Sequence, residues 1–126
     1  MEEAVARVAL SYDACQLAET AGAAVPAGGE ELVAARAVLQ AADRYVESVV
    51  ALARLRGSSW QQIAAALGRS EDAVRRASRP EAGDWWREHL LDDPAEAACD
   101  LDDWVSRHLD CDPGPAPVSG VLPATV

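Results

Sequence analysis

The spacing of apolar residues predicts helices along most of the chain, beginning with residues 2–21. Apolar side chains in this stretch recur every three or four positions, the period of one helical face. They are Val5, Val8, Tyr12 and Cys15. Residues 22–29 contain a proline and two adjacent glycines, which is typical of a connection. A longer helix is predicted over residues 30–56, because two glutamates open it and two arginines lie near its end, as the helix dipole favours.

The apolar line of this longer helix repeats about every 3.5 residues, close to the period of a coiled-coil seam. Its members are Ala35, Val38, Ala42, Tyr45, Val49 and Leu52. A long seam of small apolar residues can pack on the first helix of the same chain or on its copy in a second subunit. Both alternatives are open from the sequence, and the second makes a homodimer an expected state of the protein.

Residues 57–79 are predicted to form two short helices joined by a tight turn. Gly57 suits the left-handed end of the preceding helix. Ser58 or Ser59 can cap the next helix, because each is followed three residues later by a glutamine. Gly68 ends that helix, and Ser70 is placed to cap the following one. One apolar face of the first short helix is predicted from Trp60, Ile63, Ala64 and Leu67.

Three positions in this stretch are typical of a helix-turn-helix: a small residue, a glycine four positions later, and an aliphatic residue six after that. Here they are Ala64, Gly68 and Val74. With its flanking residues, the stretch resembles region 4 of sigma factors and the LuxR-type helix-turn-helix regulators of bacteria. The resemblance covers residues 57–79 only. It implies a recognition helix over residues 70–78 that lies in the DNA major groove. Its implied exposed side chains are Ser70, Glu71, Asp72, Arg75, Arg76 and Arg79.

The C-terminal third is predicted to be helical and then irregular. The Arg79–Pro80 pair stops the recognition helix, since the residue before a proline is pushed out of the helical region. A helix is expected over residues 84–92, and another starts at Asp93–Pro94 and runs to about residue 110. The proline-rich residues 112–126 are expected to form a flexible tail. No strand pattern occurs, so the predicted fold is an all-α bundle of about six helices.

This pattern divides the chain into four parts. Residues 1–56 form a helical hairpin with a possible dimerisation role, and residues 57–80 form the helix-turn-helix. Residues 81–111 form acidic, tryptophan-rich helices, and residues 112–126 form the tail. Stretches of apolar residues long enough to span a membrane do not occur, and the N-terminus is acidic rather than secretory. A cytoplasmic protein is therefore expected. The absence of Lys, Asn and Phe suggests a GC-rich bacterial source.

The net charge of −10 argues against a simple nucleic-acid binder until it is divided along the sequence. Residues 1–53 carry −5 and residues 80–126 carry −9, whereas residues 54–79 carry +4 from six arginines and two acids. The positive segment coincides with the predicted helix-turn-helix. Since phosphate contact acts over about 10 Å at ordinary salt, a basic patch on an acidic body can still bind DNA.

The arginines of the positive segment are the predicted DNA contacts. Arg75, Arg76 and Arg79 are expected to reach bases or backbone, because a guanidinium fork matches both guanine and phosphate. Arg69, Arg54 and Arg56 are expected to hold flanking phosphates. Glu71 and Asp72 depart from the neutral or basic residues that a strong binder prefers here. Glu71 could accept a hydrogen bond from a cytosine amino group, yet both acids repel phosphate.

Other chemistry-bearing residues do not form a recognisable site in the sequence. His89, Cys99, His108 and Cys111 are zinc-type ligands, but their spacing favours ordinary packing for Cys99 and a helix-end role for His108. We therefore expect no metal, no cofactor and no enzymatic activity. The tryptophans of the acidic third are expected to anchor the last helices, and their alternative role is a partner surface.

The sequence thus predicts a sequence-specific, DNA-binding transcription regulator. Its expected partner is double-stranded DNA, bound by a homodimer. The alternative is a protein-interaction module with the same fold, such as a sigma-like docking domain or an acidic anti-sigma or antitoxin-type partner. RNA polymerase is a possible partner for the acidic C-terminal helices in either case.

Overall fold

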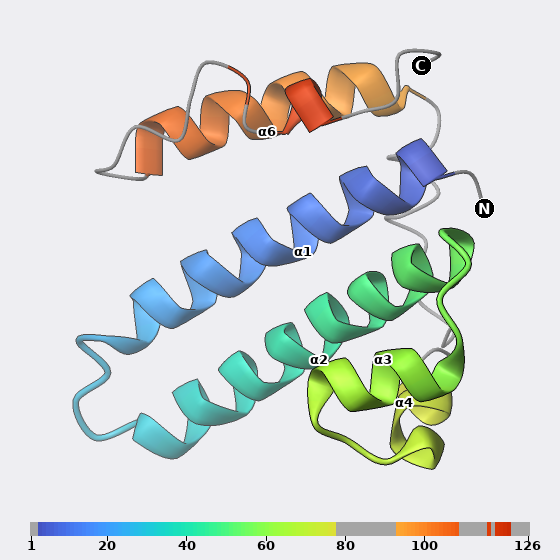
Figure 1. Ribbon diagram of the computed structural model, residues 1–126. Helices are drawn as coiled ribbons and strands as arrows, with labels where there is room; N and C mark the ends of the chain where they lie inside the picture. The colour runs from blue at the N-terminus through green and yellow to red at the C-terminus, as the bar shows by residue number, and fades with distance from the viewer. Residues whose placement is uncertain (1–2, 78–92, 109–115, 117, 122–126) are drawn as a thin grey trace.

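The computed structural model describes residues 3–77, 93–108, 116 and 118–121, and all its regular structure in those residues is helical (Figure 1). The elements are α1 (Glu3–Ala24), α2 (Glu31–Leu55), α3 (Trp60–Leu67), α4 (Glu71–Ala77), α6 (Pro94–His108) and the short 3-10 helix η1 (Ser119–Val121). The all-α prediction is confirmed. The predicted helix over residues 84–92 lies outside the described residues, as do Arg79, Trp85 and Trp86.

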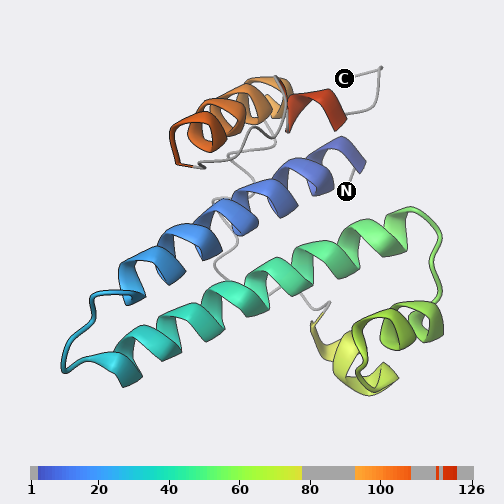
Figure 2. The same cartoon turned by 60° about the vertical axis from the view of Figure 1, so that its left-hand side comes forward.

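The long helices α1 and α2 form an antiparallel hairpin, and the other elements lie on either side of it. Figures 1 and 2 both show α6 running along the outer side of α1, while α3 and α4 lie against the end of α2. The hairpin therefore separates α6 from the α3–α4 pair. The predicted ends of both long helices are correct to within three residues. The largest difference is at the end of α1, which continues to Ala24 instead of residue 21.

One hydrophobic core joins α1 to α6. Its buried members are Val8, Cys15, Ala98, Leu101, Val105 and Val118. Trp104 packs against this core while its indole nitrogen donates a 2.7 Å hydrogen bond to Glu19 of α1. Trp104 therefore anchors α6 to the hairpin, as the sequence predicted for the tryptophans. Asp93 caps α6 by accepting a 3.1 Å hydrogen bond from the Glu96 amide, also as predicted.

The prediction of a flexible tail over residues 112–126 is wrong for residues 118–121. Val118 is only 4% exposed, and the residues after it form η1. The carboxylate of Asp102 on α6 accepts hydrogen bonds from the amides of Val118 (2.6 Å) and Ser119 (3.1 Å) and from the Ser119 hydroxyl. Burying a valine and pairing three donors with one carboxylate offsets the entropy of ordering this segment. The remaining tail residues, except Ala116, lie outside the described residues.

A buried polar contact links the two long helices. The carboxylate of Asp13 on α1 accepts a hydrogen bond from the hydroxyl of Ser48 on α2, and both side chains are almost fully buried. A buried carboxylate is costly unless such donors surround it. Sliding α1 along α2 would separate this pair, so Asp13 and Ser48 favour a single register of the hairpin.

Most of the predicted apolar seam of α2 packs within the chain. Leu52 is buried, and Val38, Ala42, Tyr45 and Val49 are partly buried, whereas Ala35 is exposed. Large apolar side chains at this end of the hairpin are exposed, with Leu32 at 88%. The others are Val25, Val33 and Leu39. The N-terminal part of α2 therefore presents an apolar surface to its surroundings. None of the described helices has the length and apolar content that crossing a bilayer requires.

Candidate nucleic-acid interface

The start of α3 is fixed by a change of direction after α2. Gly57 takes a φ of 91°, which a residue without Cβ adopts at little cost, and the Ser58 amide donates back to the Ala53 carbonyl (3.0 Å). Of the two capping boxes that the sequence allowed, the structure forms the one between Ser59 and Gln62. The Ser59 hydroxyl accepts from the Gln62 amide at 3.1 Å, and the Gln62 side chain accepts from the Ser59 amide at 2.8 Å.

The turn between α3 and α4 has the predicted residues in the predicted roles. Gly68 takes a left-handed conformation with φ 66° and ψ 32°, and the Arg69 amide donates to the Ala64 carbonyl at 3.0 Å. Ser70 caps α4, its hydroxyl accepting a 3.2 Å hydrogen bond from the Ala73 amide. We call residues 57–77 the α3–α4 corner. A Cβ at position 68 would meet nothing within 4 Å, so the left-handed backbone, and not crowding, requires glycine.

A second hydrophobic core holds α4 in place. Val74 is 1% exposed and packs with Val50 of α2 and with Ile63 and Ala64 of α3. Burying a side chain of this size contributes on the order of 1.5–3 kcal/mol relative to exposure. Because Val74 faces inward, the opposite side of α4 faces outward. The exposed residues at Ser70 and along α4 are Ser70, Glu71, Asp72, Arg75 and Arg76, of which Asp72 and Arg76 lie opposite Val74.

The arginines on α4 are exposed but engaged within the helix. The Arg75 guanidinium forms a 2.7 Å ion pair with Glu71 one turn earlier, and these side chains are 53% and 46% exposed. Arg75 also lies 5.4 Å from the centre of the Trp60 ring. Arg76 makes a longer contact, 3.4 Å, from its Nε to the Asp72 carbonyl. Both guanidiniums therefore remain at the surface. Any anion that binds Arg75 has to displace Glu71 from it.

The flanking arginines take three different positions. Arg54, in α2, lies over the Trp60 ring at 4.5 Å and donates to the Ser58 carbonyl at 3.0 Å, so its side chain packs against the α3–α4 corner. Arg69 is exposed in the turn. Arg56 instead forms a 2.8 Å ion pair with Glu3 on α1. Trp60 thus brings Arg54 and Arg75 together from α2 and α4, whereas Arg56 is directed toward α1. Arg79 lies outside the described residues.

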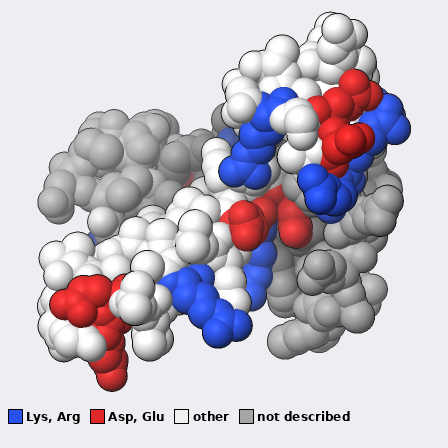
Figure 3. Space-filling model, turned by 90° about the horizontal axis from the view of Figure 1, so that it is seen from below, with Lys and Arg blue, Asp and Glu red and all other residues white. Residues whose placement is uncertain are grey.

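The charge of this face is mixed rather than uniformly positive. Figure 3, seen from the side of α2, α3 and α4, shows basic and acidic side chains interspersed at the end that carries the corner. The exposed row of α4 contains two acids and two arginines, so its own formal charge is zero. The excess positive charge of this region comes from Arg69 in the turn and from Arg54, which lies beside the corner on Trp60.

No family model, curated protein or solved structure matches the chain. The functional assignment therefore depends on the geometry of the chain itself.

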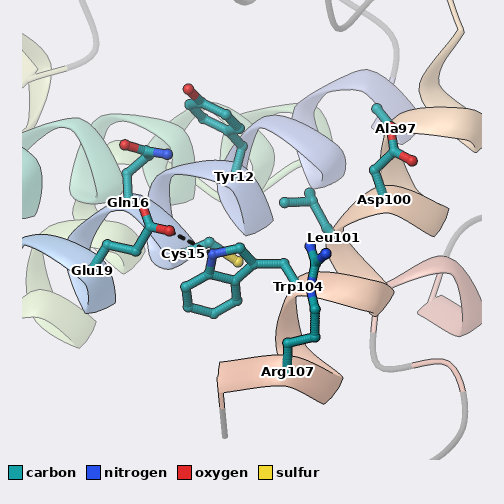
Figure 4. Close-up of a pocket in the computed structure, with 9 residues that line it drawn as sticks. All are labelled: Tyr12, Cys15, Gln16, Glu19, Ala97, Asp100, Leu101, Trp104 and Arg107. Carbon is teal, nitrogen blue, oxygen red and sulfur yellow. Dashed lines mark hydrogen bonds between the residues drawn. The ribbon is translucent and has the colours of Figure 1, made fainter. Parts of the chain in front are cut away.

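A pocket lies between α1 and α6 (Figure 4). It has a volume of about 290 Å³, and Tyr12, Leu101 and Trp104 contribute apolar lining. Cys15 also lines it, and burial together with the nearby Glu19 raises the pKa of its thiol to about 11. Cys15 is therefore a poor nucleophile at neutral pH.

The histidine and cysteine predictions have a mixed outcome. Cys99 is exposed, so the expectation that it packs in the interior is wrong. His108 ends α6, as predicted, with its ring stacked on Trp104 at 4.3 Å and its Nδ1 2.8 Å from the Trp104 carbonyl. The described part of the chain contains no group of three or more side chains suited to hold a metal ion. His89 and Cys111 lie outside it.

Sequence reasoning missed two features of this region. The contacts of Arg54 and Arg75 with the Trp60 ring could not be predicted from the sequence, because they depend on how α2, α3 and α4 pack together. The Glu71–Arg75 pair, in contrast, has the i,i+4 spacing of a helical ion pair and could have been found from the sequence.

Proposed function

We propose that the protein binds duplex DNA through the α3–α4 corner, with α4 as the recognition helix of a bacterial transcription regulator. The observation that carries the proposal is the burial of Val74. It holds one side of α4 against α2 and α3, while the polar and charged side chains of the helix remain exposed. An exposed short helix held in this way is suited to enter a major groove.

The arginines support distinct roles in such a complex. Arg76 points away from the core and has only a long backbone contact, so it can exchange that contact for a base or phosphate. Arg75 can do the same once its ion pair with Glu71 opens. Half-exposed ion pairs of this type are worth only about 0.3–0.5 kcal/mol, so opening it costs little. In this proposal, Arg54 and Arg69 bind the DNA phosphates on either side of the recognition helix.

We propose further that the protein acts as a homodimer through the exposed apolar end of the hairpin. The side chains of this surface are Val25, Leu32, Val33 and Leu39. None of the four belongs to the predicted α2 seam, which packs largely within the chain; they are a separate set of apolar side chains that packing on α1 does not cover. A two-fold pairing would present two copies of α4 to two half-sites.

The DNA proposal is tested by fluorescence polarisation with labelled duplex fragments at two salt concentrations. Wild-type protein is expected to bind with an affinity that falls steeply as salt rises. The Arg75→Ala/Arg76→Ala variant should bind at least about tenfold more weakly, and its salt slope should fall by about 1 to 2. The Arg36→Ala/Arg44→Ala variant is the matched control, because it loses the same charge from exposed positions of α2. Equal losses in both variants, or no binding at all, would contradict the proposal.

The acidic surface favours a second candidate, a protein-docking module. Glu96, Asp100 and Asp103 are exposed along α6, and Glu71 already neutralises Arg75 on α4. The candidate partner is a basic surface, such as one on RNA polymerase. Co-elution with purified bacterial RNA polymerase, lost in an Asp100→Asn/Asp103→Asn variant that retains wild-type helicity, would support docking. Co-elution unaffected by these substitutions would exclude the α6 acids as its basis.

A further inference from the structure

A cavity of about 430 Å³ lies between α1 and the C-terminal half of α2. Leu10, Val49 and Leu52 give it apolar walls, and Arg7 and Arg56, whose like charges interact with each other, also line it. Its size falls within the usual range of small-molecule sites. Two positive groups on an apolar cavity form an arrangement that hydrophobic packing alone does not explain.

Arg7 carries a charge that its described neighbours do not neutralise. It is partly buried, and its one hydrogen-bond partner in the described chain is the neutral hydroxyl of Ser11 at 2.7 Å. Burial is the main cause of a lowered pKa at Arg7, and the positive charge of Arg56 lowers it further. Electrostatic interaction with Tyr45, which also lines the cavity, acts in the opposite direction.

Arg56 has a carboxylate partner, but a single carboxylate neutralises only one of the two arginine charges. Glu3 pairs with Arg56 at 2.8 Å, which leaves a formal charge of +1 on the three side chains Glu3, Arg7 and Arg56. A guanidinium holds a carboxylate or phosphate through parallel hydrogen bonds. An incoming anion would therefore relieve the repulsion between Arg7 and Arg56 and satisfy donors that Ser11 leaves unused.

We propose that this cavity binds a small organic anion, with its charged group on Arg7 and Arg56 and its apolar body against Leu10, Val49 and Leu52. The apolar walls distinguish such a ligand from an inorganic ion. The cavity also reaches Ser58, in the connection between α2 and α3, so an occupant contacts the segment that leads into the α3–α4 corner.

Isothermal titration calorimetry on the full chain tests the site, with sodium octanoate as the probe. Octanoate is expected to bind saturably with one site per chain, and octan-1-ol and inorganic phosphate should each bind at least about tenfold more weakly. Arg7→Met keeps the apolar stem and removes the charge, and should weaken octanoate binding about tenfold or more. Arg56→Met should also weaken it, which gives a second variant if one of them loses helicity.

The charge-matched control is Arg36→Met, on the exposed part of α2, which should bind octanoate as the wild type does. Absence of saturable octanoate binding in the millimolar range would overturn the proposal. So would equal affinity in Arg7→Met and wild type, and so would phosphate binding as tight as that of octanoate, because it would show that the apolar walls contribute nothing. The measurement contains no DNA, so its outcome is independent of the proposed regulatory function.

Discussion

Replacing Glu71 by glutamine should strengthen DNA binding, because Glu71 acts twice against it. It holds Arg75 in a 2.7 Å ion pair and adds a negative charge to the exposed row of α4. A carboxylate about 7 Å from a phosphate is repelled by ~0.6 kcal/mol in water and by ~2.4 kcal/mol at an effective dielectric constant of 20. Salt screens much of this energy, so the expected gain at physiological salt is about three- to tenfold. Loss of the ion pair should lower the stability of the fold by only about 0.3–0.5 kcal/mol.

The assay is fluorescence polarisation with a duplex of random sequence, since specific base contacts then play no part. Glu96→Gln is the matched control: it removes the same charge from an exposed position of α6, across the hairpin from α4. We expect Glu71→Gln to bind more tightly than wild type and Glu96→Gln to change affinity much less. Identical affinities for the two variants would refute the placement of α4 at the DNA.

Three further predictions concern packing, assembly and thiol reactivity. Val74→Ala should lower the free energy of unfolding by about 1–3 kcal/mol in urea denaturation, since it opens a gap in the core beneath α4; an unchanged stability would contradict the described packing. Leu32→Glu should convert a dimer to a monomer in analytical ultracentrifugation without lowering the melting temperature, because Leu32 is 88% exposed in the chain; a monomeric wild type would exclude the dimer. Iodoacetamide at pH 8 should label the exposed Cys99 well before Cys15. Cys15 is buried, and with a pKa of about 11 its thiol is only about 0.1% ionised at that pH. Mass spectrometry of the labelled peptides gives the order. Raising the pH toward 11 should increase the labelling of Cys15.

Local signals in the sequence predicted the helices and the corner well. Gly68 needs a left-handed backbone, Ser70 caps, and Val74 follows at the spacing that turns it inward; each of these features depends on a few neighbouring residues. The spacing of apolar residues and the capping pair Asp93–Pro94 also predicted where α6 begins. Physical rules that act within one or two helical turns can be read from one sequence.

Contacts between distant segments could not be obtained in this way. Nothing near Asp102 in the sequence indicates that it binds the amides of Val118 and Ser119, so the tail was expected to be flexible. The cavity at Arg7 and Arg56 likewise arises only when α1 lies beside the end of α2. In both cases the decisive neighbour is more than ten residues away, and its distance depends on the whole fold.

The continuity of α2 has a mechanical consequence. Its 25 residues span roughly 37 Å as a single rod, with the exposed Leu32 near one end and Val50, which holds α4, near the other. A swing of about 10° around the Leu32 end would displace the α4 end by roughly 5 Å, more than the rise of one base pair. In the proposed dimer, the angle at which the two copies of α2 cross would therefore set the spacing between the two DNA half-sites. Inserting one residue midway along α2 would turn its two ends about 100° relative to each other, so the two halves of α2 could not both keep their packing on α1.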